Sequence, residues 1–275
     1  MGESEAIAET DRPVTTASLV ADLRALGVVP GMTAMVHSSL SRLGWVAGGA
    51  HAVVAALREA VGDEGTLMMP THSSQLSDPA AWQNPPVPES WWAPIRAETP
   101  AYDPALTPTE HMGRIVECFR HVPGVRRSAH PTVSAAAVGP NAAALIDGHQ
   151  LAHGLGETSP QARLYELDGH ILLLGVTHAN NTSLHLAENR AAPSNAAIAT
   201  YGSPVMVDGH REWTAYPNLV DSADDFERIG TAFASETGRQ RTGPVGAGTA
   251  HLMHSRDVVD FAVDWLRVNR TWATH

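Results

Sequence analysis

A strand–helix–strand pattern in the N-terminal quarter constrains the fold of this chain most strongly. Residues 33–36 form an apolar run typical of a buried strand, a Ser- and Gly-rich loop covers 38–49, and a helix is expected over 52–61. After a Gly-Asp-Glu-Gly turn, residues 66–69 form a second apolar run. Such a unit builds a parallel sheet with a right-handed crossover, so we expect both strands to end at the same edge of one sheet.

Apolar patterns elsewhere extend this unit to an α/β fold. The continuous apolar run 171–176 is typical of a central parallel strand, and Asp208-Gly209 favours a hairpin between 205–207 and 212–215. Thr16 or Ser18 could cap a first helix that carries Leu19, Leu23 and Leu26 on one face and ends at Gly27. Further elements are a short strand over 133–138 and helices over 112–120, 140–146, 182–192 and 255–268. We therefore predict a mixed, largely parallel central sheet flanked by helices.

Two segments without periodicity indicate the domain organisation. Residues 1–13 are polar and acidic, which is typical of a flexible leader, so residues 14–275 are predicted to form a single domain. Residues 78–108 are rich in Pro and Trp and have neither helical nor strand period. A loop of this length is usually functional or mobile, and its alternative is a surface excursion that packs its own aromatic side chains.

Composition excludes several classes of protein. The chain has 18 Lys and Arg against 29 Asp and Glu, a formal net charge of −11, so nucleic acid is not an expected partner. The surplus of carboxylates would attract a cationic small molecule, although it also suits an ordinary soluble surface. Cys118 is the single cysteine, which excludes an internal disulfide and favours the cytoplasm. Because no apolar run reaches the roughly 18 residues of a membrane span, no membrane partner is expected.

A histidine and a carboxylate follow the apolar run 171–176. On a helix that begins near residue 182, His185 and Glu188 stand three positions apart on one face, close enough for the carboxylate to fix the tautomer of the imidazole. The first-turn position would disfavour the imidazolium and keep a neutral general base. Two alternatives stay open, a structural histidine and a metal site of His178, His185 and Glu188, although the spacing matches none of the helical zinc motifs.

Small polar residues follow the first two predicted strands. The segments 37–40 (His-Ser-Ser-Leu) and 71–74 (Thr-His-Ser-Ser) lie at carboxyl ends of strands, where ligands of open α/β sheets gather. Backbone N–H groups over 38–40 or 71–74 are the expected donors to an oxyanion or a phosphate. The loop contains no GK[ST], GxGxxG or GxSxG pattern, so it is neither a nucleotide loop nor a nucleophile elbow.

Six ordered blocks of the chain closely resemble the aminoglycoside 3-N-acetyltransferases. The resemblance spans about residues 14 to 268, and its blocks are VHSSLSRLGWVAGG, GDEGTLMMPTHSS, YDPALTPTEHMGRIVECFR, VPGVRRSAHPTVSAAAVGP, GLGETSP and DGHILLLGVTHANNTSLHLAE. It implies a mixed α/β fold distinct from the GNAT acetyltransferases, acetyl-coenzyme A as co-substrate without a metal, and acetylation of the 3-amino group of a 2-deoxystreptamine aminoglycoside.

The resemblance also implies roles for individual residues. The family's proposed base falls on His185, with Glu188 alongside, and the blocks associated with coenzyme A fall on His37, Ser38, Ser39, Leu40, Thr71, Ser73 and, with the SAHP block, His130. Some members use a further carboxylate downstream, for which Asp221 and Asp224 are candidates. The side chains expected to bind the cationic aminoglycoside are Asp78, Asp103, Glu110, Glu157, His178 and Asp221.

Three alternatives to this function remain. An acetyltransferase of the same fold could act on a different amine, a noncatalytic protein could sequester cationic drugs, and a metal-dependent hydrolase would use the histidines as ligands. A monomer and a homodimer are both compatible with the sequence.

Overall fold

The structure is a computed structural model that describes residues 7, 8, 10 and 12–274. The expected flexible leader covers residues 1–13, and residues 1–6, 9 and 11 of that segment lie outside the described part of the chain. A helix long and apolar enough to cross a membrane is absent from the residues that the structure describes.

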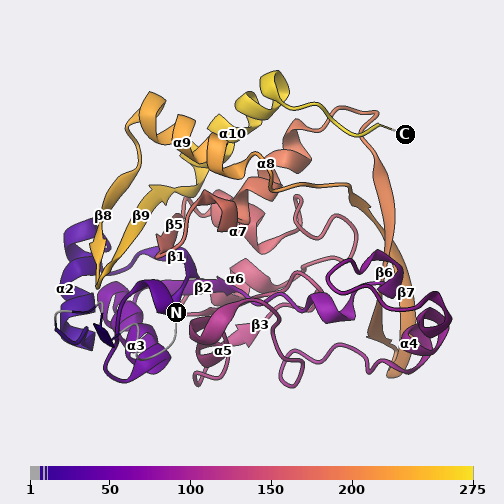
Figure 1. Cartoon of the computed structure of the whole chain (residues 1–275), viewed down its shortest axis with the longest axis horizontal. Coiled ribbons are helices and arrows are strands. Elements are labelled where there is room, and N and C mark those ends of the chain that lie inside the picture. Colours follow the sequence, from indigo (N-terminus) through magenta and orange to yellow (C-terminus); the bar gives the residue numbers. More distant parts are fainter. Residues whose placement is uncertain (1–6, 9, 11, 275) are drawn as a thin grey trace.

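A seven-stranded mixed sheet forms the centre of the molecule, in the order β3-β4-β2-β1-β5-β9-β8 (Figure 1). The mixed sheet flanked by helices is confirmed, but the sheet is not largely parallel: its parallel pairs, β1 with β2 and β1 with β5, are confined to the central three strands. The outer strands pair antiparallel; β8 and β9, for example, are separated by residues 246–247 only, a connection too short for a parallel crossover. The strands are β1 (Thr33–Ser38), β2 (Thr66–Pro70), β3 (Arg126–Arg127), β4 (Ala135–Val138), β5 (His170–Leu174), β8 (Arg241–Val245) and β9 (Gly248–His254).

Helices cover both faces of this sheet because the buried strands alternate apolar side chains between them. On β1, Ala34 and Val36 belong to one core, whereas Met35 belongs to the other. The first face is covered by α2 (Thr16–Leu26), α3 (Gly49–Val61) and α5 (Gly113–Phe119). The second is covered by α6 (Ala142–Ile146), α7 (Pro160–Glu166), α8 (Ser183–Ala191), α9 (Phe226–Thr237) and α10 (Ser255–Asn269).

Local sequence signals account for the ends of these helices. The first predicted helix is confirmed as α2, which begins after a capping box in which Thr15 and Ser18 bond each other's backbone N–H groups. Gly27 ends it, as expected, in the left-handed conformation with φ 113°. The predicted helix over 182–192 is confirmed as α8, one residue shorter at each end.

A separate two-stranded ribbon stands at the side of the molecule opposite β8 (Figure 1). The hairpin predicted across Asp208-Gly209 is confirmed, with longer strands than expected, β6 (Ile198–Val207) and β7 (His210–Leu219). The segment 78–108 was expected to lack regular structure, but it contains the short helix α4 (Trp92–Glu98). Arg211 on β7 binds the carbonyl of Thr99 after this helix, which holds the segment against the ribbon.

Candidate active site

Helix α8 begins directly above the centre of the sheet. The hydroxyl groups of Thr182 and Ser183 lie 3.9 and 3.8 Å from the sulfur of Met35 on β1. The side chain of Asn181 accepts a hydrogen bond from the N–H of Ser183 at 3.2 Å, which satisfies a free donor of the first turn. These contacts place His185, the third residue of α8, over the carboxyl ends of the parallel strands.

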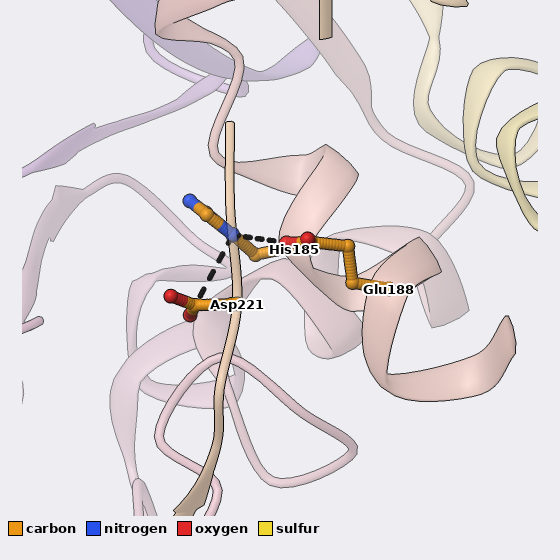
Figure 2. Close-up of side chains that lie close together, drawn as sticks. All are labelled: His185, Glu188 and Asp221. Atoms are coloured by element: carbon orange, nitrogen blue, oxygen red, sulfur yellow. Dashed lines mark hydrogen bonds and ion pairs between the residues drawn. The ribbon is translucent and has the colours of Figure 1, made fainter. Parts of the chain in front are cut away.

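His185 is oriented by a buried carboxylate. Its Nδ1 donates to Oε2 of Glu188 at 2.5 Å, and Glu188 is fully buried. The other carboxylate oxygen of Glu188 accepts from Arg270 and, at 3.0 Å, from the N–H of Ser222. Because Nδ1 carries the donated proton, Nε2 of His185 is left with its lone pair, the arrangement that a general base needs (Figure 2).

A second carboxylate, Asp221, approaches the same imidazole from the chain just beyond β7. Its Oδ2 lies 3.7 Å from Nδ1 of His185 (Figure 2). Burial of the ring acts to lower the pKa of His185, but the hydrogen bond to Glu188 and the charge of Asp221 outweigh it, so the pKa is raised. The pKa of His185 is therefore shifted in the direction opposite to the one expected from the helix dipole alone. The two carboxylates stabilise the imidazolium by more than the N-terminus of the helix destabilises it.

Two adjoining cavities open at the carboxyl ends of the parallel strands. The smaller, the His185 pocket, has a volume of about 230 Å³ and is lined by His185, His37, His72 and Phe226 among others. The larger cavity, about 1180 Å³, lies between the segment after β1, the start of α3 and the segment after β5. The two cavities share the lining residues Ser38, His111, Met112, Val176 and Asn180, so a long ligand in the larger one can reach His185.

Two neutral histidines line the His185 pocket with unbonded ring nitrogens. Nε2 of His37 and Nε2 of His72 are buried and have no hydrogen-bond partner within the described part of the chain. Burial lowers the pKa of both side chains to about 3, with smaller contributions from neighbouring histidines. At neutral pH both rings are therefore uncharged.

Several of the backbone donors expected at the strand ends are already bonded. The N–H of Ser39 donates to the carbonyl of Leu174, that of Thr71 to Ser134, and that of Ser73 to Thr132, at 3.0, 2.8 and 2.9 Å. These groups complete the sheet and are not free for a ligand. The hydroxyl oxygen of Ser38 is buried in the same region and lacks a partner among the described residues.

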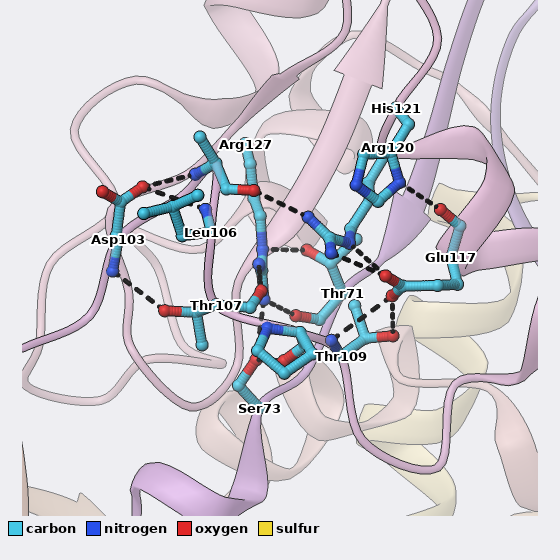
Figure 3. Close-up of polar contacts among 12 residues, drawn as sticks. Thr71, Ser73, Asp103, Leu106, Thr107, Thr109, Glu117, Arg120, His121 and Arg127 are labelled. Carbon is cyan, nitrogen blue, oxygen red and sulfur yellow. Dashed lines mark hydrogen bonds and ion pairs between the residues drawn. The ribbon is translucent and has the colours of Figure 1, made fainter. Parts of the chain in front are cut away.

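Arg127 holds the segment 71–73 beneath the His185 pocket. Its guanidinium donates to the carbonyl of Thr71 at 2.6 Å and to the hydroxyl of Ser73 at 2.7 Å, and also to the carbonyl of Thr107 at 2.6 Å (Figure 3). The side chain of Thr71 is further fixed by the hydroxyl of Ser134 at 3.1 Å. Thr71 and Ser73, which were expected to contact coenzyme A, are thus buried in a polar network that shapes the strand end.

The carboxylates expected to bind an aminoglycoside have various partners. Asp78 forms an ion pair with Arg96 at 2.7 Å, and Glu157 forms one with Arg190 at 2.8 Å. Asp103 accepts from the N–H groups of Ala105 and Leu106, and Glu110 accepts from the hydroxyl of Ser74 at 2.5 Å. Asp221 is the one among them that lies beside His185.

The remaining histidines with expected roles have bonded ring nitrogens. His178 is buried and its Nε2 pairs with the side chain of Gln240 at 2.8 Å. His130 is also buried, with Nδ1 accepting from the N–H of Val133 at 3.2 Å and Nε2 donating to the carbonyl of Leu151 at 3.2 Å. The metal site considered from the sequence combined His178 with His185 and Glu188. Within the described residues, the three side chains whose possible metal-ligand atoms lie within 4.8 Å of one another are His185, Glu188 and Asp221, so His178 is not part of the group.

Sequence reasoning missed several residues that build this site. Arg270 and Ser222 complete the environment of Glu188, Arg127 fixes the second strand end, and His72 lines the pocket. His72 stands between two residues that the resemblance did select, so the signal for it was present. Arg270 lies 82 positions from Glu188, and no local pattern connects the two.

A histidine oriented by a buried carboxylate, beside a cavity at the carboxyl ends of parallel strands, is an arrangement suited to acid–base chemistry in an α/β enzyme. The chain belongs to the aminoglycoside 3-N-acetyltransferase family of acyltransferases, whose family model matches residues 35–267. The SPbeta prophage-derived aminoglycoside N(3')-acetyltransferase-like protein YokD of Bacillus subtilis is 44% identical over 260 residues, 94% of each chain. The aminoglycoside N(3)-acetyltransferase VII of Streptomyces paromomycinus is 39% identical over 97% of this chain and 96% of its own.

Solved structures of relatives share the fold. The crystal structure of YokD from Bacillus subtilis has a TM-score of 0.94 at 43% identity and covers 97% of this chain and 98% of its own. A binary complex of AAC-IIIb with CoASH has a TM-score of 0.84 at 30% identity, covering 96% and 99%. AAC-VIa bound to sisomicin has a TM-score of 0.83 at 33% identity, covering 94% and 100%.

Proposed function

We propose that this protein transfers the acetyl group of acetyl-coenzyme A to the 3-amino group of 2-deoxystreptamine aminoglycosides, with His185 as general base. The observation that carries the proposal is the imidazole of His185, whose Nδ1 is held by Glu188 at 2.5 Å while the ring lines a pocket continuous with a larger cavity. Family membership supports the same chemistry, as do the relatives solved with CoASH and with sisomicin.

The larger cavity suits the donor. Ser38, Ser39 and Leu40 line it after β1, and Arg42 and Arg114 line it as well, so cations are available for phosphate groups. Gly49 at the start of α3 also lines it, and the dipole of the helix favours an anion near that end. In this arrangement the pantetheine arm runs past Ser38 and Asn180, which line both cavities, and brings the thioester to His185.

Acetyl transfer then proceeds directly in a ternary complex. The neutral acceptor amine attacks the thioester carbon, and the carbonyl π electrons move to oxygen. Nε2 of His185 takes the proton from the amine nitrogen, and Glu188 stabilises the resulting imidazolium. As the carbon–sulfur bond breaks, the sulfur receives the proton from the imidazolium, which releases coenzyme A as a thiol and restores the base. Metal ions have no role in this scheme.

The acceptor is a polycation, so carboxylates around His185 should attract it. Asp221 is the strongest candidate, because it lies 3.7 Å from Nδ1 of His185 and retains about a third of its side-chain exposure, 35%. Glu110 follows Thr109 in the segment that leads to His111 at the mouth of the pocket. Asp78, Asp103 and Glu157 have intramolecular partners, so we assign them a smaller share of acceptor binding, and His130 and His178 a supporting one.

The proposal places the reaction in the cytoplasm, within a single domain formed by residues 14–275, in a monomer or a homodimer. Resistance to the modified antibiotic follows if the acetylated amine is one that the drug needs for its action.

Thiol release from acetyl-coenzyme A, measured with 2-deoxystreptamine aminoglycosides and with simple polyamines, tests the proposal. We expect turnover with the aminoglycosides and its loss in His185→Ala, with binding of acetyl-coenzyme A retained. His121→Ala, which alters an exposed histidine outside both cavities, is the matched control and should behave like the wild type. Turnover restricted to polyamines would identify a different acceptor, and binding without thiol release would indicate a sequestering protein.

A further inference from the structure

An acyl transfer site needs a hydrogen-bond donor for the oxygen of the thioester, and three of the backbone donors expected at the strand ends are occupied. The N–H groups of Ser39, Thr71 and Ser73 all donate to carbonyls of neighbouring strands or loops. With these three groups unavailable, a side chain that lines the pocket is a candidate donor to the oxygen that becomes negative in the tetrahedral intermediate. This question rests on the proposed function, which supplies the thioester.

His72 offers such a donor. Its Nε2 is buried and has no partner among the described residues, and the side chain lines the same pocket as His185. Burial lowers the pKa of His72 to about 3, with a smaller contribution from His185, so the ring is neutral at neutral pH. A neutral imidazole can donate one hydrogen bond without losing a proton to the solvent.

Two other buried histidines, His149 and His130, differ in this respect, whereas His37 shares the unbonded Nε2. His149 uses Nδ1 with the hydroxyl of Ser128 at 2.9 Å and Nε2 with the carbonyl of Gly154 at 2.6 Å. His130 likewise bonds backbone groups through both nitrogens. Histidines with a structural role in this part of the protein are therefore satisfied. An unbonded polar atom in a buried position carries a desolvation cost, which a bound ligand would offset by accepting its hydrogen bond.

The backbone of His72 is held on both sides. Arg127 bonds Thr71 and Ser73, the two residues that flank it (Figure 3). The carbonyl of His72 itself accepts from the N–H of Glu110 at 2.9 Å. Such support fixes the backbone that carries the ring before the substrate arrives, and preorganised donors are the ones that stabilise a transition state.

We propose that His72 is a second catalytic residue, whose neutral imidazole donates a hydrogen bond through Nε2 to the carbonyl oxygen of the acetyl thioester. The bond strengthens as the amine attacks and the π electrons move to that oxygen, and it weakens when the carbonyl re-forms and the thiolate leaves. His72 neither gains nor loses a proton in the cycle, whereas His185 carries the proton from nitrogen to sulfur.

Kinetics of two variants separate this role from acceptor binding. For His72→Ala we expect kcat to fall about 100-fold to 1000-fold, the usual loss for one oxyanion donor. The acceptor KM and the dissociation constant of acetyl-coenzyme A should stay within about twofold, since the lost bond strengthens only in the transition state. His72→Gln, whose amide N–H can reach the position of Nε2, should recover part of kcat. An unchanged kcat, or a loss confined to the acceptor KM, would overturn the assignment.

An infrared measurement tests the same bond without turnover. In the binary complex with acetyl-coenzyme A labelled with ¹³C at the thioester carbonyl, the stretching frequency should be lower than in solution. The decrease should vanish in His72→Ala, return in part in His72→Gln and persist in His185→Ala. A wild-type complex without this decrease overturns the role of His72 even if acetyl transfer occurs. If the decrease is present but no aminoglycoside is acetylated, the acceptor assignment fails and the role of His72 stands.

Discussion

Glu188 and Arg270 form an ion pair beneath His185, and both side chains are almost fully removed from solvent, with exposed fractions of 0% and 8%. The carboxylate turns its other oxygen to Nδ1 of His185 at 2.5 Å. The pair thus links the base on α8 to Arg270, the residue that follows α10. Orientation of the imidazole depends on the end of a helix that contributes nothing else to the pocket.

Removal of Arg270 should destabilise the protein strongly. Arg270→Ala leaves the buried carboxylate of Glu188 without its cation, and we expect the free energy of unfolding to fall by about 3–5 kcal/mol. Chemical denaturation monitored by circular dichroism measures this loss. Arg267→Ala, on the exposed side of α10, removes an ion pair of 3.7 Å whose partners are 57% and 83% exposed. It should change the free energy by less than about 0.5 kcal/mol, and equal losses in the two variants would contradict the account.

Substitution of Asp221 should shift the pH dependence of turnover. The charge of Asp221 contributes to the raised pKa of His185, so Asp221→Asn stabilises the imidazolium less and lowers that pKa. Since the base must be neutral to act, the rising limb of kcat/KM against pH should move to lower pH. Glu188 and Arg270 are unchanged in this variant and continue to hold the ring.

The matched control for this prediction is Asp224→Asn, three positions along the same exposed segment. In Asp224→Asn the rising limb of kcat/KM should lie at the same pH as in the wild type when both are measured with the same aminoglycoside. A limb that stays in place in Asp221→Asn, or moves to higher pH, would refute the electrostatic role of Asp221.

Arg127 and Arg126 are adjacent but should respond differently to mutation. Arg127→Ala removes the donors to Thr107 and Ser73 and frees the segment that carries His72 (Figure 3). We expect a loss of about 2 kcal/mol or more in stability together with a lower kcat. Arg126 forms an exposed pair with Asp147, so Arg126→Ala should cost less than about 0.5 kcal/mol and leave kcat unchanged. Denaturation and steady-state kinetics of both variants decide the matter.

Aminoglycoside affinity should weaken as salt is raised. The chain carries a formal net charge of −11, and a polycation approaching an acidic site is attracted through a field that mobile ions screen. Between about 0.02 M and about 0.5 M salt the Debye length falls several-fold, so the dissociation constant measured by calorimetry should rise steadily. An affinity independent of ionic strength would argue against capture by acidic side chains.

Local signals in the sequence predicted much of the fold. Gly27 at the end of α2 and Asp208-Gly209 act within a few positions, and the structure confirms the elements they indicated. The N-cap of α2 is Thr15 and not Thr16 or Ser18, a shift that the pattern does not resolve. The hairpin of β8 and β9 was not expected, because Arg241–Val245 has little apolar alternation and is held by pairing with β9. Antiparallel pairing at the outer strands likewise depends on how the chain returns to the sheet, which no single segment encodes.

In the candidate site, too, the contacts between neighbouring residues could be predicted from the sequence, whereas those between distant segments could not. His185 and Glu188 are neighbours on one helical turn, so their contact followed from spacing. Asp221 was selected as a candidate, but its distance from His185 depends on the path of the chain after β7. The role of Arg270, 82 positions from Glu188, and the unbonded ring of His72 emerge only when distant segments are packed together.

Location of the acetyl group on the product tests the central claim most directly. Purified protein would be incubated with acetyl-coenzyme A and a 2-deoxystreptamine aminoglycoside, and the product assigned by two-dimensional NMR. The account predicts a single acetamide on the nitrogen at position 3, formed in equal amount to the thiol released. Acetylation at another nitrogen, a mixture of sites, or no acetylated product would contradict it.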